Sequence, residues 1–182
     1  TKASKPGDDR SPPHTWKGNL YSDGEHVALP AENLASCLAT AGGRMRTGKG
    51  METYKKYTQS GILFLDPYLE FRNAGKRFAI PDIEAIDGTF PEHAEMVKKM
   101  GFELLIKPAK PQRNRTHIRV RPWFKEWSAS TVVTIIEDRL TAEVLTELWY
   151  QAGRYIGLGD WSPSKGSPGP YGRFEISMEA VE

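Results

Sequence analysis

The chain has 182 residues, of which 38% are hydrophobic and 26% are charged, and its formal net charge at pH 7 is +2. These values are typical of a globular protein, and one domain of ordinary size accommodates this length. No window approaches the roughly 20 consecutive apolar residues of a membrane span, so the sequence predicts a soluble, cytoplasmic protein without a membrane partner. Because the net charge is too small to indicate a partner, the distribution of charge along the chain must do so.

The N-terminal residues 1–15 lack apolar periodicity and are rich in turn formers. We expect them to form a flexible arm, followed by a single α+β domain over residues 16–182. Trp16–Tyr21 is a candidate first strand, and a turn then leads into a second candidate strand at His26–Leu29.

A helix is predicted next, because Pro30 suits a first helical position and apolar residues follow at helical spacing until Gly42 and Gly43. The only cysteine, Cys37, lies in this pattern and is predicted to be a core residue. The basic segment that follows, residues 44–57, is predicted to be a mobile insertion. It lacks the full spacing of a phosphate-binding loop, which argues against nucleoside triphosphate binding there.

Short apolar or alternating runs predict strands at Ile62–Leu65, Tyr68–Phe71 and Arg77–Ile80. The next segment, residues 82–100, contains a predicted short helix over Pro91–Met100 and concentrates the acidic residues of the chain. Its potential metal ligands are Asp82, Glu84, Asp87, Glu92, His93 and Glu95. Their spacing matches neither an EF-hand loop nor an HExxH helix, so a solvated acidic face is the favoured interpretation, with no metal and no cofactor.

Positive charge gathers between residues 107 and 125, after a predicted strand at Phe102–Ile106. From Thr116 the chain alternates, which places His117, Arg119 and Arg121 on one face of a strand and Ile118 and Val120 on the other. Arginine and lysine neutralise phosphates, and nearby aromatic residues can stack on bases. This region therefore favours nucleic-acid binding, with Arg113, Arg115, Arg119 and Arg121 as candidate contacts.

A further β-branched strand is predicted at Val132–Ile136, before a helix capped by Thr141. The apolar stripe of this helix includes Val144, Leu145, Leu148, Trp149, Ala152, Tyr155 and Ile156. A long loop rich in glycine and proline follows, and alternation returns over residues 173–176, where a closing strand is predicted.

Two segments resemble a known family. LPAENLASCLATAGGR (Leu29–Arg44) and GRYIGLGDWSPSKGSPGPYGRFEI (Gly153–Ile176) are similar to segments of the repeat-associated mysterious protein superfamily, the second to its C-terminal glycine-rich signature. That superfamily includes the RNA-binding backbone and processing subunits of CRISPR effector complexes, and its core is an RRM-like βαββαβ sheet. The resemblance implies RNA contacts by Lys165 and Arg173 in the glycine loop. It also implies contacts by Arg44, Arg46 and Lys49 after the first helix.

The sequence as a whole predicts an α+β fold: a ferredoxin-like or RRM-like antiparallel sheet with two main helices and irregular insertions. The predicted function is a non-catalytic RNA-binding module of a nucleoprotein assembly, CRISPR-like or phage-related, which associates with other subunits or with itself. Two alternatives stay open. One is a metal-assisted ribonuclease that uses Asp82, Glu84, Asp87 or His93, and the other is a single-stranded DNA-binding or annealing protein.

Overall fold

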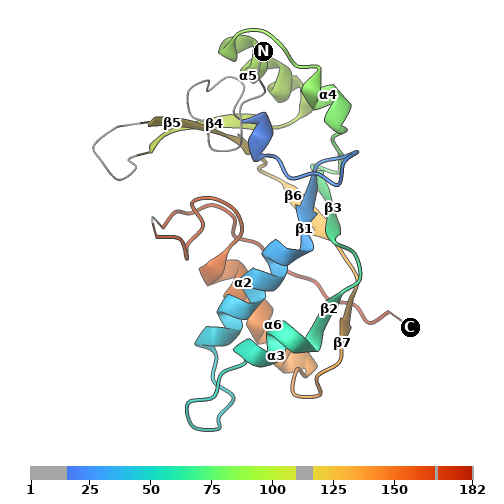
Figure 1. The fold of residues 1–182 in the computed structure, drawn as a ribbon, viewed down its shortest axis with the longest axis vertical. Helices are drawn as coiled ribbons and strands as arrows, with labels where there is room; N and C mark the ends of the chain where they lie inside the picture. The colour runs from blue at the N-terminus through green and yellow to red at the C-terminus, as the bar shows by residue number, and fades with distance from the viewer. Residues whose placement is uncertain (1–15, 110–116, 167, 182) are drawn as a thin grey trace. The chain divides into compact units, whose positions relative to one another are not determined.

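The computed structural model describes residues 16–109, 117–166 and 168–181, so the predicted arm over residues 1–15 lies outside the described residues. In the described part the protein is a mixed α+β structure with small antiparallel sheets (Figure 1). The elements follow one another in the order η1 (Lys17–Asn19), β1 (Ala28–Pro30), α2 (Ala31–Arg44), α3 (Lys55–Gly61), β2 (Ile62–Phe64), β3 (Tyr68–Asn73), α4 (Ile80–Glu84), α5 (Phe90–Met100), β4 (Glu103–Ala109), β5 (His117–Trp123), β6 (Trp127–Ser130), β7 (Val133–Ile135), α6 (Ala142–Gln151) and η2 (Ala152–Ile156).

The chain divides into two compact units, each built from two separate stretches of sequence. Unit 1 comprises Thr1–Leu29 and Tyr68–Ser130, and unit 2 comprises Pro30–Pro67 and Thr131–Glu182. The backbone therefore passes from one unit to the other after residues 29, 67 and 130. The interpretation of residues 16–182 as one domain stays a prediction.

The core of unit 1 is centred on Trp16, which is fully buried. Its indole Nε1 donates a hydrogen bond of 3.0 Å to Nδ1 of His93, and the side chain of His93 is also fully buried. The indole also meets the ring of Phe102 edge-on, at a centroid distance of 6.0 Å. A buried polar group is costly without a partner, so this pairing lets an indole N–H lie inside an apolar core. The buried residues of this core are Trp16, Val27, Phe71, Phe78, Ile83, Ile86, Val97, Phe102 and Val120.

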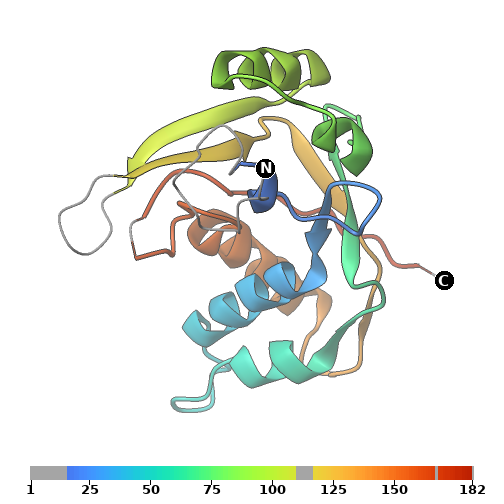
Figure 2. The ribbon, with the colours of Figure 1, turned by 45° about the horizontal axis from the view of Figure 1, so that its top comes forward.

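Helix α5 confirms the predicted helix over Pro91–Met100, and local signals define both of its ends. Thr89 and Glu92 form a reciprocal capping box at its start, where Pro91 occupies the first turn. Gly101 ends it in the left-handed region at φ 115°. Figure 2 shows α5 lying along β4, with which it is in contact.

Two segments of unit 1 that were predicted to be strands contain or precede a helix in the structure. Trp16–Tyr21 contains the short 3-10 helix η1, whose Lys17 Nζ donates to the carbonyl oxygens of Glu84, the last residue of α4, and of Ile86. Arg77–Ile80 leads into α4 because Pro81, with its fixed φ, occupies the first turn of that helix.

The main sheet of unit 1 has the strand order β1-β3-β6. Strands β3 and β6 are antiparallel, with a register that runs from Glu70 opposite Ser130 to Asn73 opposite Trp127. Strand β3 confirms the prediction for Tyr68–Phe71. Strand β6 was not predicted, because its sequence WSAS carries small and polar residues rather than β-branched ones.

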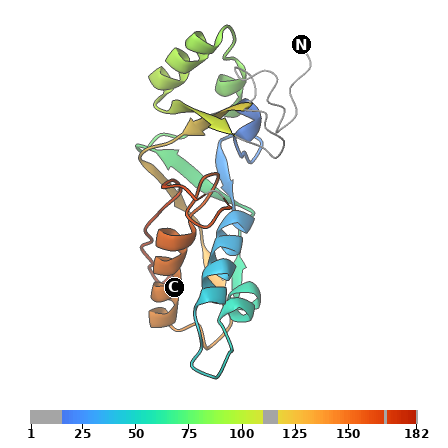
Figure 3. The same ribbon diagram turned by 90° about the vertical axis from the view of Figure 1, so that its left-hand side faces the viewer.

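Unit 2 is built on the packing of α2 against α3, α6 and η2, and Figure 3 shows α2 and α6 lying side by side. Helix α2 continues past the predicted stop and ends at Arg44. Gly42 is buried inside it, and a Cβ atom there would lie 2.9 Å from Thr58 Oγ1 and 3.1 Å from the backbone nitrogen of Lys55. The glycine is therefore required because α3 approaches α2 closely, and the helix does not end there.

Strands β2 and β7 form an antiparallel pair within unit 2, with Leu63 opposite Thr134. This confirms the predicted strands at Ile62–Leu65 and Val132–Ile136. Pro30, predicted at the first helical position, is the N-cap residue and directly precedes α2. Cys37 is buried, as the sequence predicted.

We expect Trp16→Ala to lower the free energy of unfolding by about 3–5 kcal/mol, the usual cost of truncating a buried Trp or Phe. The loss follows from the emptied core volume and the broken bond to His93. Urea denaturation monitored by far-UV circular dichroism measures it. Tyr21→Ala is the control, because Tyr21 is 51% exposed and its loss should change stability by no more than about 0.5 kcal/mol. Equal denaturation midpoints for the two variants would contradict this view of the core.

Candidate nucleic-acid interface

The β4–β5 hairpin of unit 1 brings cationic side chains together on one face. Residues opposite each other in an antiparallel pair point to the same side of the sheet. The register places Lys107 opposite Arg119, Leu105 opposite Arg121, and Glu103 opposite Trp123. The predicted common face of Arg119 and Arg121 is thereby confirmed, and β4 adds Lys107 to it. We call Lys107, Arg119, Arg121 and Trp123 the basic face.

The other side of the hairpin explains why the basic face is turned away from the core. Val120 lies between the two arginines in sequence and is 1% exposed, and Leu104 packs against the same core cluster. With a period of two, burial of Val120 forces its neighbours to the opposite side of the strand. Arg119 and Arg121 are half-buried, and Nη1 of Arg121 donates 3.2 Å to the carbonyl oxygen of Val120.

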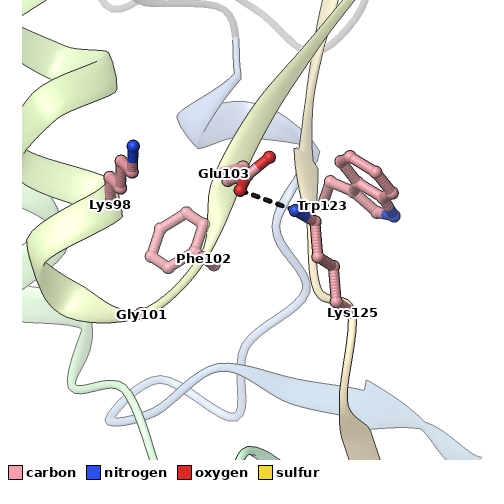
Figure 4. A pocket seen from close by; sticks show the side chains of 6 residues that line it. All are labelled: Lys98, Gly101, Phe102, Glu103, Trp123 and Lys125. Carbon is pink, nitrogen blue, oxygen red and sulfur yellow. Dashed lines mark hydrogen bonds and ion pairs between the residues drawn. The ribbon is translucent and has the colours of Figure 1, made fainter.

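An acidic residue at the base of this face is neutralised by a cation. Figure 4 shows Lys125 reaching to Glu103, and the Nζ–Oε1 distance is 2.7 Å. The same Nζ lies 4.6 Å from the centre of the Trp123 ring, within the range of a cation–π contact. These residues, with Lys98, line an open pocket of about 170 Å³. The result is a half-exposed indole beside charged side chains, a combination able to contact both a base and a phosphate.

Two of the predicted contacts, Arg113 and Arg115, lie outside the described residues. The remaining predicted cations belong to unit 2. Arg44 ends α2, and Arg46 and Lys49 lie in the turn that follows it; all three side chains are exposed. Lys165 and Arg173 are exposed in the glycine-rich segment.

The predicted mobile insertion after α2 is closed by hydrogen bonds. Arg46 and Thr53 form an antiparallel bridge, and the Glu52 carboxylate holds the turn together. Hydrogen bonds to that carboxylate from Lys56, Tyr57 and Thr47 lower the pKa of Glu52 to about 2. The carboxylate therefore stays ionised throughout the neutral range, and the turn presents Arg46 and Lys49 from a bonded hairpin.

The glycine-rich segment packs by close backbone approach. Gly172 has φ 70°, and its carbonyl oxygen accepts a hydrogen bond of 2.8 Å from the N–H of Leu158. A Cβ atom on Gly172 would lie 1.8 Å from the Leu158 carbonyl oxygen, and one on Gly153 would lie 2.0 Å from the Phe174 oxygen. Residues 173–176 lie outside the strands, so the predicted closing strand is absent from the described structure. The alternation there accompanies contact with Gly153 and not a strand pairing.

The buried thiol of Cys37 faces the beginning of this segment. Its Sγ lies 3.5 Å from the carbonyl oxygens of Ala152 and Gly157. Burial raises the pKa of Cys37 to about 12, so the thiol is protonated and unreactive in the folded protein. This agrees with the prediction of a core residue.

A π-helix changes which residues face solvent after α6. Tyr155 was predicted on the buried stripe but is 45% exposed. The π-helix η2 widens the last turn, as the bond from the Gly157 N–H to the Ala152 oxygen shows, and this shifts the helical phase. Tyr155 then meets Tyr150, five residues earlier, at a centroid distance of 6.3 Å, and Arg154 donates to the Tyr150 hydroxyl. In the sequence, the five-residue spacing of Tyr150 and Tyr155 matches the i to i+5 geometry of a π-helix and is a signal for this cluster.

The acidic segment that was considered as a metal site separates its histidine from its acidic residues. His93 lies inside the core with Nδ1 occupied by Trp16, while Asp82, Glu84 and Asp87 are exposed. Among the described residues, His, Cys, Asp and Glu form no group of three or more that could hold a metal ion. The ribonuclease alternative therefore loses its histidine as a surface ligand.

No helix within residues 16–109, 117–166 and 168–181 has the length and apolar composition needed to cross a membrane. Comparison with protein-family models, with curated proteins and with solved structures finds no match for this chain.

We expect Gly172→Ala to destabilise the protein by more than about 1 kcal/mol, because a side chain is strained at positive φ and would overlap the Leu158 carbonyl. Gly166→Ala is the matched control in the same loop, since no atom lies within 4 Å of its added Cβ and its φ is not in the left-handed region. That change should stay within about 0.5 kcal/mol of the wild type. Thermal and urea unfolding of both variants measure the difference, and equal effects would contradict the close approach.

Proposed function

We propose that the chain is a cytoplasmic, non-catalytic RNA-binding module of a nucleoprotein assembly, CRISPR-like or phage-related. The observation that carries the proposal is the basic face of the β4–β5 hairpin. On it Lys107 and Arg119 are directly opposite each other, and Arg121 and Trp123 follow on the same side of β5. Cationic side chains grouped in this way can neutralise the phosphates of a nucleic acid.

The composition of the basic face favours a single strand with accessible bases. Arginine and lysine bind phosphates of any sequence, and an aromatic ring offers a stacking surface to any base. Trp123 is half-exposed at the end of β5, with Lys125 over its ring. A base stacked near this indole would leave its phosphate within reach of the strand's arginines. In double-stranded RNA the bases are not free to stack in this way.

The remaining candidate cations belong to unit 2 and are proposed as separate RNA contacts. Arg44, Arg46 and Lys49 follow α2, as in the family resemblance, and Lys165 and Arg173 lie exposed in the glycine-rich segment. We also propose the finer fold, a ferredoxin-like or RRM-like sheet of the repeat-associated mysterious protein superfamily. Its support is that strand β1 leads directly into helix α2 and that β3 and β6 pair antiparallel before helix α6.

Binding of labelled single-stranded RNA should weaken steeply with salt, each neutralised phosphate adding about −0.7 to the slope of log K against log salt. Arg119→Glu with Arg121→Glu should make this slope shallower by about 1.4, which is twice the contribution of one phosphate. Affinity at fixed salt should fall by roughly tenfold or more, because a hydrogen bond to a charged group is worth about 1.5–3 kcal/mol. Fluorescence anisotropy measures both quantities.

The control for this experiment is Lys76→Glu with Arg77→Glu, which makes the same charge change at exposed positions of unit 1. If both double variants bind as the wild type does while remaining folded, the basic face is not the contact. A single-stranded DNA of the same sequence forms the second arm. Tighter binding to DNA than to RNA would favour the alternative of a single-stranded DNA-binding protein.

Labelled RNA should survive prolonged incubation with the protein and Mg²⁺ or Mn²⁺, because the described residues hold no metal-ligating group. Denaturing gels before and after incubation test this. Cleavage that persists through purification and disappears in Asp87→Ala would support the ribonuclease alternative. Cleavage unchanged in that variant would indicate a contaminating nuclease.

A further inference from the structure

Strand β7 and its flanking residues, Val132–Ile136, form a segment of unusual composition. Its sequence VVTII contains β-branched residues alone, with no charge and no proline. Three of its aliphatic residues are well exposed: Val132 at 44%, Ile135 at 37% and Ile136 at 59%. A strand with apolar side chains on both faces is typical of a position covered from both sides.

Hydrogen bonding shows which edge of this segment is open. The N–H of Leu65 donates 3.3 Å to the Val132 oxygen, and the N–H of Ile136 donates 2.9 Å to the Gly61 oxygen. In an antiparallel ladder the residues alternate in direction, so the N–H and C=O groups of Val133 and Ile135 point away from β2. In the described part of the chain, β7 pairs with β2 alone, and Figures 1 and 2 show β2 between α3 and β7.

Natural proteins protect an open strand edge with charge, proline, a bulge or a covering segment. Val132–Ile136 has no charge and no proline. Leu63 of β2 (46% exposed) and Leu65 just after it (60% exposed) lie on the same face of the ribbon as Val132 and Ile136. An open edge without charge or proline is able to pair with another strand. The sequence of the segment indicates which strand.

We propose that β7 pairs antiparallel with β7 of a second copy of this chain, about a two-fold axis at Thr134. A two-fold interface requires that residue i contact residue j and that j contact i. VVTII meets this requirement, because Val133 then lies opposite Ile135 of the second copy and Val132 lies opposite its Ile136. Each of these pairs joins two β-branched aliphatic side chains, a combination favourable in sheets, and the threonines meet at the axis.

The interface joins two two-stranded ribbons into one sheet of four strands. The outward groups of Val133 and Ile135 then exchange hydrogen bonds with their counterparts. The contact is short, well below the roughly 800 Å² per partner of a standard interface, so the dimer is weak and concentration-dependent. This inference does not depend on the proposed RNA binding, since the basic face belongs to unit 1 and β7 to unit 2.

Charge at the axis gives a specific test. Thr134 is exposed and lies opposite its own copy, so Thr134→Lys places like charges opposite each other, as does Thr134→Glu. Each variant alone should have a dimer dissociation constant raised at least about tenfold. An equimolar mixture of the two should recover the dimer, because lysine then faces glutamate. Thr146→Lys, at an exposed threonine of α6, is the control and should dimerise as the wild type does.

Sedimentation velocity on the nuclease-treated full chain over a wide concentration range measures these constants, and far-UV circular dichroism checks folding. A wild-type chain that stays monomeric at every concentration would overturn the proposal. So would Thr134→Lys dimerising normally, or folded single variants whose mixture does not recover. RNA affinity of the monomeric variants, measured in parallel, distinguishes failure of this inference from failure of the proposed function.

Discussion

The burial of Val120 is the constraint on which the candidate interface depends. With that side chain 1% exposed in the core of unit 1, strand β5 has one possible orientation, and Arg119 and Arg121 must lie on its opposite side. A shift of β5 by one residue would carry one of these guanidinium groups into the buried place of Val120, which is costly. The packing that stabilises unit 1 therefore also orients the arginines of the basic face.

Aromatic packing around this strand supplies the rigidity that a binding face needs. Phe102, at the start of β4, contacts Trp16, Phe78 and Phe124 through ring centroid distances of 4.9–6.0 Å. Trp16 in turn requires His93 as the acceptor for its indole N–H. A histidine that resembled a metal ligand in the sequence thus completes the core beneath the basic face. His93 therefore belongs to the core, whereas Asp82, Glu84 and Asp87 are exposed.

In unit 2, several backbone segments pack closely against each other at glycine residues. Gly42 admits α3 to the side of α2, and Gly153 and Gly172 admit neighbouring carbonyl groups at distances that no Cβ atom tolerates. Unit 2 also has an aliphatic edge at β7, so positive charge and uncovered apolar surface lie on different parts of the same unit.

Patterns of period two and 3.6 were sufficient to predict several elements of this protein. They indicated α2, α5, α6, β5 and β7, as well as the common face of Arg119 and Arg121, because local propensity and burial agree there. The mixed α+β class follows from the same patterns. The family resemblance added Lys165 and Arg173, and both side chains are exposed.

Tertiary structure decided the remaining features, each through a contact between residues distant in sequence. The division of the chain into two units of alternating sequence stretches has no local signal. The cross-strand pairing of Lys107 with Arg119 depends on the register of a hairpin, and the exposure of Tyr155 depends on one widened helical turn. Gly42 terminates a helix by propensity but lies within one here, because a neighbouring helix needs the space of its missing side chain. Local sequence sets the preference of each segment, whereas close packing between segments determines which preferences are overridden.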